Sequence, residues 1–347
     1  MKKTIISLLI ITVLALSEAY SDRDIYILKR GDIASQEINS VNVLHLDSSG
    51  ELIDQWTVNP DDMRLRRRAT DRYMSLSGDG GKLAIQGFVF VRQEDDNVPV
   101  FATFDLSEKT FSTKTMVGEG LRQRSVATVD GNQFFYTGKT DLDGIRYIEV
   151  GEEPPGVEFT SVTFALQQVK VIGENLWASR GTGIIHHGVF YLPWLGAIEG
   201  EEIVEVTLLD GEGWDRSHGE YRDFDVILSE GLLFVGASRF GGLKQLKVFQ
   251  SDTTTEGNLS YDDWDLFDFR DLPIRDNIIG VQAAKNGDGS ISLYYSTLRD
   301  IYLIEFYPGE PEGSRWSVPV KLAPDFLSTG EVWGGMVVVM SATPPLD

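Results

Sequence analysis

The feature that most constrains this chain is a hairpin pattern that recurs along almost its whole length. Each instance is an apolar strand, a turn built from Gly, Asp, Glu or Asn, and a second apolar strand. The turns fall about 45 to 60 residues apart, a spacing typical of four-stranded repeat units. Asp-Gly and Gly-Asp turns supply the positive φ angles that short hairpin loops require. The instances lie at residues 73–87, 125–138, 169–179, 224–238 and 281–295.

The segments between and around these hairpins also have the character of strands. Each gap holds two further runs rich in β-branched and aromatic residues, which completes a four-stranded unit per hairpin. A last unit combines 332–341 from one end of the chain with 24–28, 41–46 and 52–58 from the other. Such sharing closes a ring and leaves no sheet edge open. We therefore predict an all-β fold, a single β-propeller of six blades, with seven as the alternative.

The composition agrees with a closed fold that has many turns. Of the 347 residues, 35 are Gly and none is Cys, which excludes disulfides, zinc-thiolate sites and thiol nucleophiles. The hydrophobic fraction of 42% is ordinary for a globular protein and allows a large core. We expect one domain over residues 20–347, stabilised by its core and its closed topology.

The first residues have the pattern of a secretory signal peptide. Lys2 and Lys3 form a basic start, and 5–16 is an apolar run too short to span a bilayer. Ser17 and Ala19 place small residues at the −3 and −1 positions of a cleavage site. We predict a signal peptide at 1–19 and a secreted protein, periplasmic if the host is bacterial. An uncleaved anchor is the alternative.

The net charge of −22 limits the partners of the chain. A surface this acidic repels nucleic acid and anionic membranes, so we expect neither nucleic-acid binding nor membrane insertion. It attracts cations and basic partners, which leaves a calcium-facing or mineral-facing surface open. We expect a monomer that meets an extracellular ligand or protein partner whose identity the sequence does not specify.

The repeats resemble those of secreted β-propellers, a broad class that includes the WD40-like and quinoprotein-like repeat families. Residues 75–85, with the sequence SLSGDGGKLAI, carry the resemblance best. The resemblance implies an architecture and not an activity. No repeat has a Gly-His or Trp-Asp signature, and the Trp-rich quinone-binding repeat is absent, so no catalytic residue can be carried over.

Basic residues precede the predicted inner strands of successive units. A ring of such side chains around one channel mouth would bind a carboxylate, sulfate or phosphate group. Alternatively, each basic residue pairs with an acidic neighbour such as Asp71, Asp223 or Asp276 and ties adjacent blades together. The candidate residues are Arg68, Arg72, Arg124, Lys170, Arg222 and Arg275.

Other chemistry is weakly indicated. His187 adds a titratable group near the same mouth, but adjacent His186 and His187 point to opposite faces of a strand, so we predict no metal site from them. Calcium is possible at the turns 141–144 and 286–290, and no other cofactor is predicted. The chain has no nucleophile elbow, no phosphate-binding Gly loop and no HExxH motif.

Three functions remain open from the sequence. The leading hypothesis is an extracellular binding or scaffold propeller with its ligand at one mouth of the channel. The first alternative is an extracellular hydrolase or lyase that acts on carbohydrates with acidic residues at that mouth. The second alternative is an acidic matrix protein that associates with calcium or mineral. Whether the protein is an enzyme stays open, and we lean towards a binding role.

Overall fold

The computed structural model describes most of the chain, and the predicted signal peptide lies outside the described residues. The described residues are 23–32, 37–58, 63–65, 73–91, 96–112, 115–116, 122–139, 144–152, 157–161, 166–172, 175–182, 185–192, 204–209, 221–238, 244–251, 254–255, 258–259, 263–323 and 332–340.

Four sheets contain four antiparallel strands each, in which sequence neighbours are also spatial neighbours. The first consists of β26 (Val332–Met340), β1 (Arg23–Asp32), β2 (Glu37–Leu46) and β3 (Leu52–Val58). The second consists of β4 (Met74–Leu76), β5 (Lys82–Val91), β6 (Asp96–Asp105) and β7 (Thr115–Met116). The third consists of β8 (Arg122–Thr128), β9 (Gln133–Lys139), β10 (Gly144–Glu149) and β11 (Val157–Ser161). The fourth consists of β22 (Gly280–Lys285), β23 (Ile291–Ser296), β24 (Ile301–Phe306) and β25 (Val320–Ala323).

A fifth sheet has eight strands and combines two such runs. One run is β12 (Leu166–Ile172), β13 (Asn175–Thr182), β14 (Ile185–Leu192) and β15 (Val204–Leu209). The other is β16 (Tyr221–Ile227), β17 (Leu232–Ser238), β18 (Lys244–Ser251) and β21 (Asp263–Asp271). The outer strands β15 and β21 pair in parallel, and His186 of β14 pairs with Tyr221 of β16. A two-stranded ribbon, β19 (Thr254–Thr255) and β20 (Asn258–Leu259), completes the described strands.

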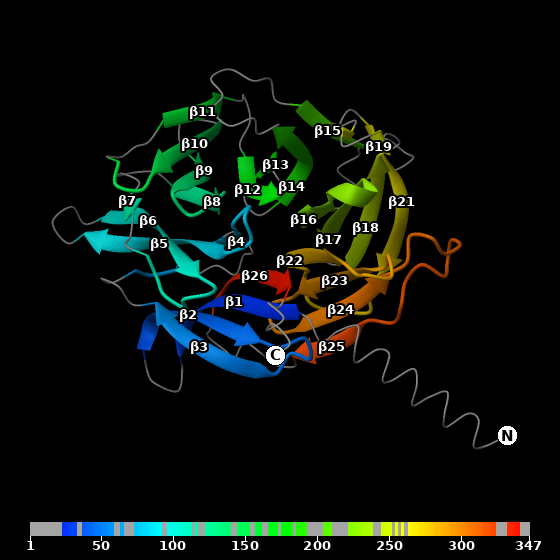
Figure 1. The fold of residues 1–347 in the computed structure, drawn as a ribbon, viewed down its shortest axis with the longest axis horizontal. Coiled ribbons are helices and arrows are strands. Elements are labelled where there is room, and N and C mark those ends of the chain that lie inside the picture. Colours follow the sequence, from blue (N-terminus) through cyan, green and yellow to red (C-terminus); the bar gives the residue numbers. More distant parts are fainter. Residues whose placement is uncertain are drawn as a thin grey trace, which may run out of the picture.

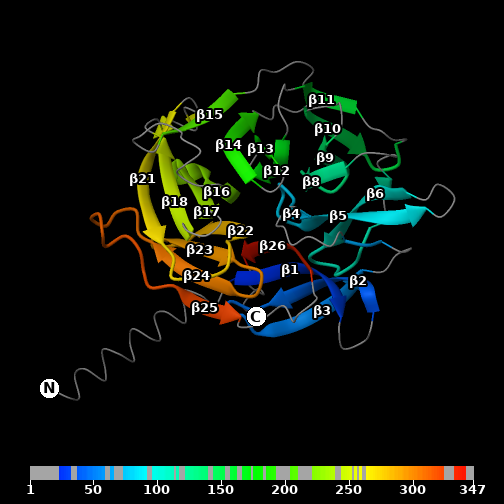
Figure 2. The ribbon, with the colours of Figure 1, turned by 180° about the vertical axis from the view of Figure 1, so that it is seen from behind.

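The sheets stand around a common centre, as Figures 1 and 2 show from opposite sides. Each run has one strand on its inner side, towards the centre: β26 in the first sheet, and β4, β8, β12, β16 and β22 in the others (Figure 1). This arrangement is a single β-propeller, as the hairpin pattern predicts. The described residues form five sheets of four or more strands, so the predicted count of six blades is not confirmed by the number of sheets.

The two ends of the described chain share one sheet. β26 pairs antiparallel with β1 from Arg23 with Met340 to Arg30 with Val332. This pairing confirms the predicted shared unit, in which one late strand joins three early ones. The inner strand of the first sheet therefore comes from the far end of the sequence, and its ladder hydrogen bonds close the ring.

The turns follow the chemistry that the sequence indicates. Gly131 and Gly289 adopt φ angles of +89° and +85°, in the Asp-Gly turns that join β8 to β9 and β22 to β23. Glycine adopts this left-handed region without the steric cost of a Cβ atom. In the second turn the Asp288 carboxylate accepts hydrogen bonds from the Ser290 amide and hydroxyl at 2.9 and 2.6 Å. These interactions fix the hairpins where the sequence places them.

Strand structure dominates the described part of the chain, in which the helical element is the 3₁₀ turn Leu228–Glu230. Among the described residues, no helix has the length and apolar character needed to cross a bilayer.

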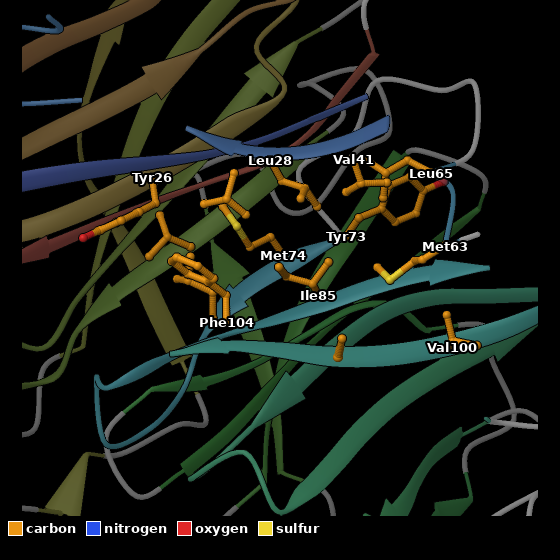
Figure 3. Close-up of a cluster of buried hydrophobic side chains, with 14 residues drawn as sticks. Tyr26, Leu28, Val41, Met63, Leu65, Tyr73, Met74, Ile85, Val100 and Phe104 are labelled. Carbon is orange, nitrogen blue, oxygen red and sulfur yellow. The ribbon is translucent and has the colours of Figure 1, made fainter. Parts of the chain in front are cut away.

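The largest apolar cluster lies between the first and second sheets. Its side chains come from alternate positions of β1, β2, β5 and β6, together with Met63 and Leu65 from the connection between the sheets (Figure 3). Leu28, Val41 and Ile85 are fully buried in it. Successive side chains of a strand point to opposite faces, so Tyr26 and Leu28 of β1 enter this cluster while Ile25 and Ile27 pack towards the fourth sheet. Burial of these faces holds the two sheets together.

Candidate functional site

The inner strands are joined to one another by a belt of hydrogen bonds around the centre. The Ser75 hydroxyl on β4 donates to the Val126 carbonyl on β8 at 2.8 Å, and the Gly78 amide donates to the Thr128 carbonyl at 3.0 Å. The Ser125 hydroxyl on β8 contacts the backbone of Val169 on β12 at 3.1 to 3.2 Å. Residues later in β4 contact residues later in β8, so neighbouring inner strands run in the same direction. These strands therefore begin at the same mouth of the channel, here called the start mouth.

The belt continues through charged groups on the other side. The Asp223 carboxylate on β16 accepts from Gln168 on β12 at 2.7 Å and from the Val281 amide on β22 at 2.8 Å. Asp225 accepts from the Ala283 amide at 2.7 Å. Two carboxylates therefore span the gap between β16 and β22. Asp223 contacts Val281 and Asp225 contacts Ala283, so β16 and β22 run in the same direction and both begin at the start mouth.

Three consecutive inner strands have a register shift directly before the residue whose side chain bonds to the next inner strand, here called the belt residue. In β8 the shift lies between Gln123 and Ser125, so Arg124 is the extra residue of a bulge. In the same way, Gln167 is the extra residue of a bulge in β12, and Arg222 is the extra residue of a bulge in β16. A bulge adds one residue to a strand, bends it and redirects side chains, and bulges are common beside functional sites. The start mouth is therefore bordered by three bulges in a row.

A fourth bulge belongs to β14, the neighbour strand of this arc. The register of β13 with β14 passes from Arg180–Gly188 to Gly181–His186, so His187 is the extra residue. His186 pairs with Tyr221, which directly precedes Arg222. The backbone positions of His187 and Arg222 are thus brought to the same mouth. Of Arg124, Gln167 and His187 the structure describes only the backbone.

Arg222 lies in a cluster with a positive character. Burial lowers the pKa of the Lys244 ammonium, and the nearby Arg222 guanidinium lowers it further, whereas Asp276 acts in the opposite direction. The Lys244 ammonium donates to the Asn277 side-chain oxygen at 2.5 Å.

Further basic groups lie in the connections and strand ends of the same mouth. Arg275 is exposed in the connection that leads into β22. Arg299 lies 3.9 Å from Asp276 and remains 67% exposed. Lys321 pairs with Asp300 at 2.9 Å. Cations outnumber carboxylates among these groups, although the whole chain carries a charge of −22.

The far mouth has the opposite character. Its hairpin turns carry Asp79, Asp130, Glu230 and Asp288. The hydrogen bond from the Ser290 hydroxyl lowers the pKa of Asp288. The basic groups on this side hold the turns together. The Lys285 ammonium, for example, pairs with Glu230.

Lys170 is a predicted site residue whose side chain is buried between neighbouring inner strands. It lies inside β12 and not before it, because β12 begins at Leu166. Its ammonium is 3.0 Å from the Asp223 carboxylate and donates to the Phe224 carbonyl at 2.6 Å. The Lys170 side chain is 9% exposed and the Asp223 side chain is fully buried. Lys170 therefore ties neighbouring inner strands, which is the alternative that the sequence left open.

The remaining predicted residues are placed only in part. Arg68 and Arg72 lie outside the described residues. Arg124, Arg222 and His187 occupy bulges at the start mouth, and Arg275 lies in the adjoining connection. Sequence reasoning did not select Gln167 or Lys244. No local signal marks Gln167, since a bulge is defined by pairing with another strand. Lys244 is brought to this mouth by the pairing of β18 with β17.

Metal ligands do not gather in the part of the chain that the structure describes. No group of three or more His, Asp or Glu side chains there has a geometry that could hold a metal ion. Of the turn 141–144, the structure describes only Gly144. In the turn 286–290, the Asn286 side-chain nitrogen donates to Ser290 and Ser292 at 2.8 and 3.1 Å.

Comparison with known proteins supports the fold. No protein-family model matches the chain, and no curated protein matches its sequence. TolB from Acinetobacter baumannii has 11% identity and a TM-score of 0.50, over 91% of this chain and 67% of that one. The β-propeller domain of Cps50 (Swd1) from Myceliophteria thermophila has 10% identity and a TM-score of 0.47, over 89% and 95%. Hsv2 from Kluyveromyces lactis has 10% identity and a TM-score of 0.39, over 82% of each chain.

The class that the topology defines is thus the β-propeller, built from repeats as the hairpin pattern indicates. The similarity to TolB agrees with this architecture and extends no further than the fold.

Proposed function

We propose that this protein is a binding propeller whose ligand carries an acid group and binds at the start mouth. The observation that supports this most directly is that the chain brings several basic residues to the strand ends and connections of this mouth, namely Arg222, Lys244, Arg275 and Arg299. Guanidinium groups bind carboxylate, sulfate and phosphate in a bidentate way. An acidic protein that gathers cations at one mouth gains specificity for an anion there, since the rest of its surface repels anions.

We also propose that the propeller has six blades and acts outside the cytoplasm. The eight-stranded sheet contains two four-stranded runs, β12 to β15 and β16 to β21, each with its own inner strand. Counting these runs separately gives the six blades that the hairpin spacing predicts. The extracellular or periplasmic location rests on the sequence of residues 1–19.

The experiment is thermal unfolding of residues 20–347 in the presence of sulfate, phosphate, small carboxylates, sulfated sugars, neutral sugars and calcium. A ligand that binds only the folded state raises Tm by mass action. We expect an anion to raise Tm and the double variant Arg124→Ala, Arg222→Ala to abolish the rise. Lys285→Ala is the matched control, because it removes one positive charge from the far mouth.

The outcomes separate the functions that the sequence left open. Failure of every anion to raise Tm would overturn the proposal. A rise with calcium alone would move the site to the acidic turns of the far mouth. Turnover of a carbohydrate, abolished by a substitution at the start mouth, would replace binding by catalysis.

A further inference from the structure

The outer strands of the sheets differ in how their free edges are protected. Short strands, Lys, Pro and coverage by another strand all hinder the pairing of a further strand at an open edge. β7 has two residues, β11 has five, and β25 has four, with Lys321 inside it and Pro319 just before it. β15 and β21 pair with each other over part of their length, and β21 carries four Asp and one Arg. β3 has seven residues, and its sequence LIDQWTV contains no Lys, Arg or Pro. Among the described outer strands, β3 therefore has the least protected edge.

β3 is exposed to solvent along most of its length. Leu52 and Ile53 are 51% and 55% exposed. Asp54 and Gln55, which point to opposite faces of the strand, are exposed as well. The register of β3 with β2 shifts at Ile53 and is regular from Asp54 to Val58, so five consecutive residues offer a straight edge. In Figure 1, β3 forms the outer border of the first sheet.

Exposed apolar side chains of the fourth sheet lie beside β3. A Cβ atom on Gly50, in the turn before β3, would be 2.6 Å from the Leu322 carbonyl oxygen, so this turn touches β25. Figures 1 and 2 show β3 and β25 next to each other from both sides. Val318 and Val320 are 76% and 55% exposed. An apolar patch that spans two sheets and borders an open strand edge is typical of an interaction surface.

The same surface carries unbalanced negative charge. Residues 47–58 contain Asp47, Glu51 and Asp54 and no Lys or Arg. Glu51 and Asp54 form no ion pair with the residues that the structure describes. The Gln55 amide donates to the Asp54 carboxylate at 2.7 Å. A carbonyl group of an added strand can take over this amide, which leaves the carboxylate to meet a cation.

We propose that β3 is a strand-addition site for a basic segment of a partner protein. The segment is extended and pairs its backbone with β3, and it alternates apolar residues with Lys or Arg. Its apolar residues contact Leu52, Ile53 and the two valines near β25, and its cations meet Glu51 and Asp54. A second copy of this chain is a poorer match, because its own β3 has no cation and each copy carries a charge of −22. This surface is separate from the start mouth, so the inference does not depend on anion binding there.

The test is binding of synthetic seven-residue peptides to residues 20–347, measured by calorimetry. One peptide alternates Val and Lys, and its matched control alternates Val and Glu. We expect the Val–Lys peptide to bind about tenfold more tightly, because opposite charges across a strand pair attract and like charges repel. Asp54→Lys should reverse this preference, and Ile53→Lys should weaken the Val–Lys peptide about tenfold or more. Leu298→Lys is the matched control, because it places the same charge on an exposed apolar residue of another turn.

A methylated peptide separates strand addition from simple attraction of charges. A Val–Lys peptide with N-methyl groups on alternate amides cannot donate to the edge of β3, so it should not bind. Binding of this peptide with unchanged affinity would overturn strand addition.

The other outcomes are equally distinct. Failure of both unmodified peptides to bind, with sulfate still raising Tm, would overturn this inference and leave the proposed function intact. Binding of the Val–Lys peptide that neither β3 variant changes would overturn the location. A dimer in sedimentation that Ile53→Lys dissociates would assign the edge to a second copy and overturn the basic partner.

Discussion

Two junctions between neighbouring sheets solve the same packing problem with different chemistry. The junction of the first and second sheets is apolar and contains Leu28, Val41 and Ile85 (Figure 3). Between the inner strands β12, β16 and β22 the contacts are polar, although apolar clusters pack the strands behind them. The Asp223 carboxylate organises these polar contacts: it accepts from Gln168, lies 3.0 Å from the Lys170 ammonium and accepts from the Val281 amide. Here they are called the apolar junction and the polar junction.

The difference shows which contacts between sheets tolerate substitution and which require particular residues. An apolar junction gains free energy in proportion to buried area and accepts other side chains of similar volume. A buried charge has a high desolvation cost and is stable only when all its partners are present. The polar junction adjoins the bulge at Arg222, so its strict geometry also positions the start mouth.

The largest effect should come from Asp223→Ala. This change leaves the Lys170 ammonium buried with fewer acceptors and removes the acceptor of the Val281 amide. We expect a loss of about 4 kcal/mol in the free energy of unfolding, measured by urea denaturation. The double variant with Lys170→Met should lose less than the sum of the two single changes. A loss below about 1 kcal/mol would show that the polar junction is not strict.

The matched change in the apolar junction is Leu28→Ala. Leu28 is fully buried, and the removed methyl groups leave a cavity. We expect a loss of about 3 kcal/mol in the same denaturation experiment. Leu28→Met should cost less than about 1.5 kcal/mol, because it nearly conserves volume. If the methionine variant were as unstable as the alanine variant, the contrast in tolerance between the two junctions would be lost.

A third effect depends on pH. Burial raises the pKa of Asp225 from 3.8 to about 6, while the nearby Lys170 lowers it and Asp223 raises it. The folded state therefore holds this proton more tightly than the unfolded state. Its contribution to stability is present below pH 4 and declines as the pH rises to about 6.

Asp225→Asn should remove this decline. Between pH 4 and pH 7 we expect the parent protein to lose about 2 to 3 kcal/mol relative to the variant. The measurement is urea denaturation of both proteins at a series of pH values, in which carboxylates elsewhere affect both equally. Parallel curves for the parent and the variant would contradict the raised pKa.

The smallest effect should come from Ser125→Ala, at a neutral contact of the same belt. The Ser125 hydroxyl contacts only the backbone of Val169, at 3.1 to 3.2 Å. We expect a loss of about 1 kcal/mol, read from the shift of Tm. A loss as large as that of Asp223→Ala would mean that charge is not what distinguishes the polar junction.

Local chemistry made the hairpins predictable from the sequence, and long-range pairing made the rest unpredictable. The turns at Gly131 and Gly289 need glycine for their positive φ, so the sequence marks them directly. The bulge at Arg222 depends on its partner strand, and the pairing of β15 with β21 joins residues more than fifty positions apart. Lys170 lies inside β12, and its ammonium is 3.0 Å from a carboxylate more than fifty positions away in the sequence. The contact of Lys170 with Asp223 depends on the packing of β12 beside β16, which no local sequence pattern predicts.

The pairing of β26 with β1 sets the timing of folding during synthesis. β1 is made first among the described strands and its inner partner is made last. Until β26 leaves the ribosome, the edge of β1 has no partner on that side and the ring stays open. A premature stop codon upstream of Val332 would therefore release an open chain with an exposed strand edge, which is a substrate for aggregation or proteolysis. Closure of the ring therefore depends on β26, the last of the described strands to be translated.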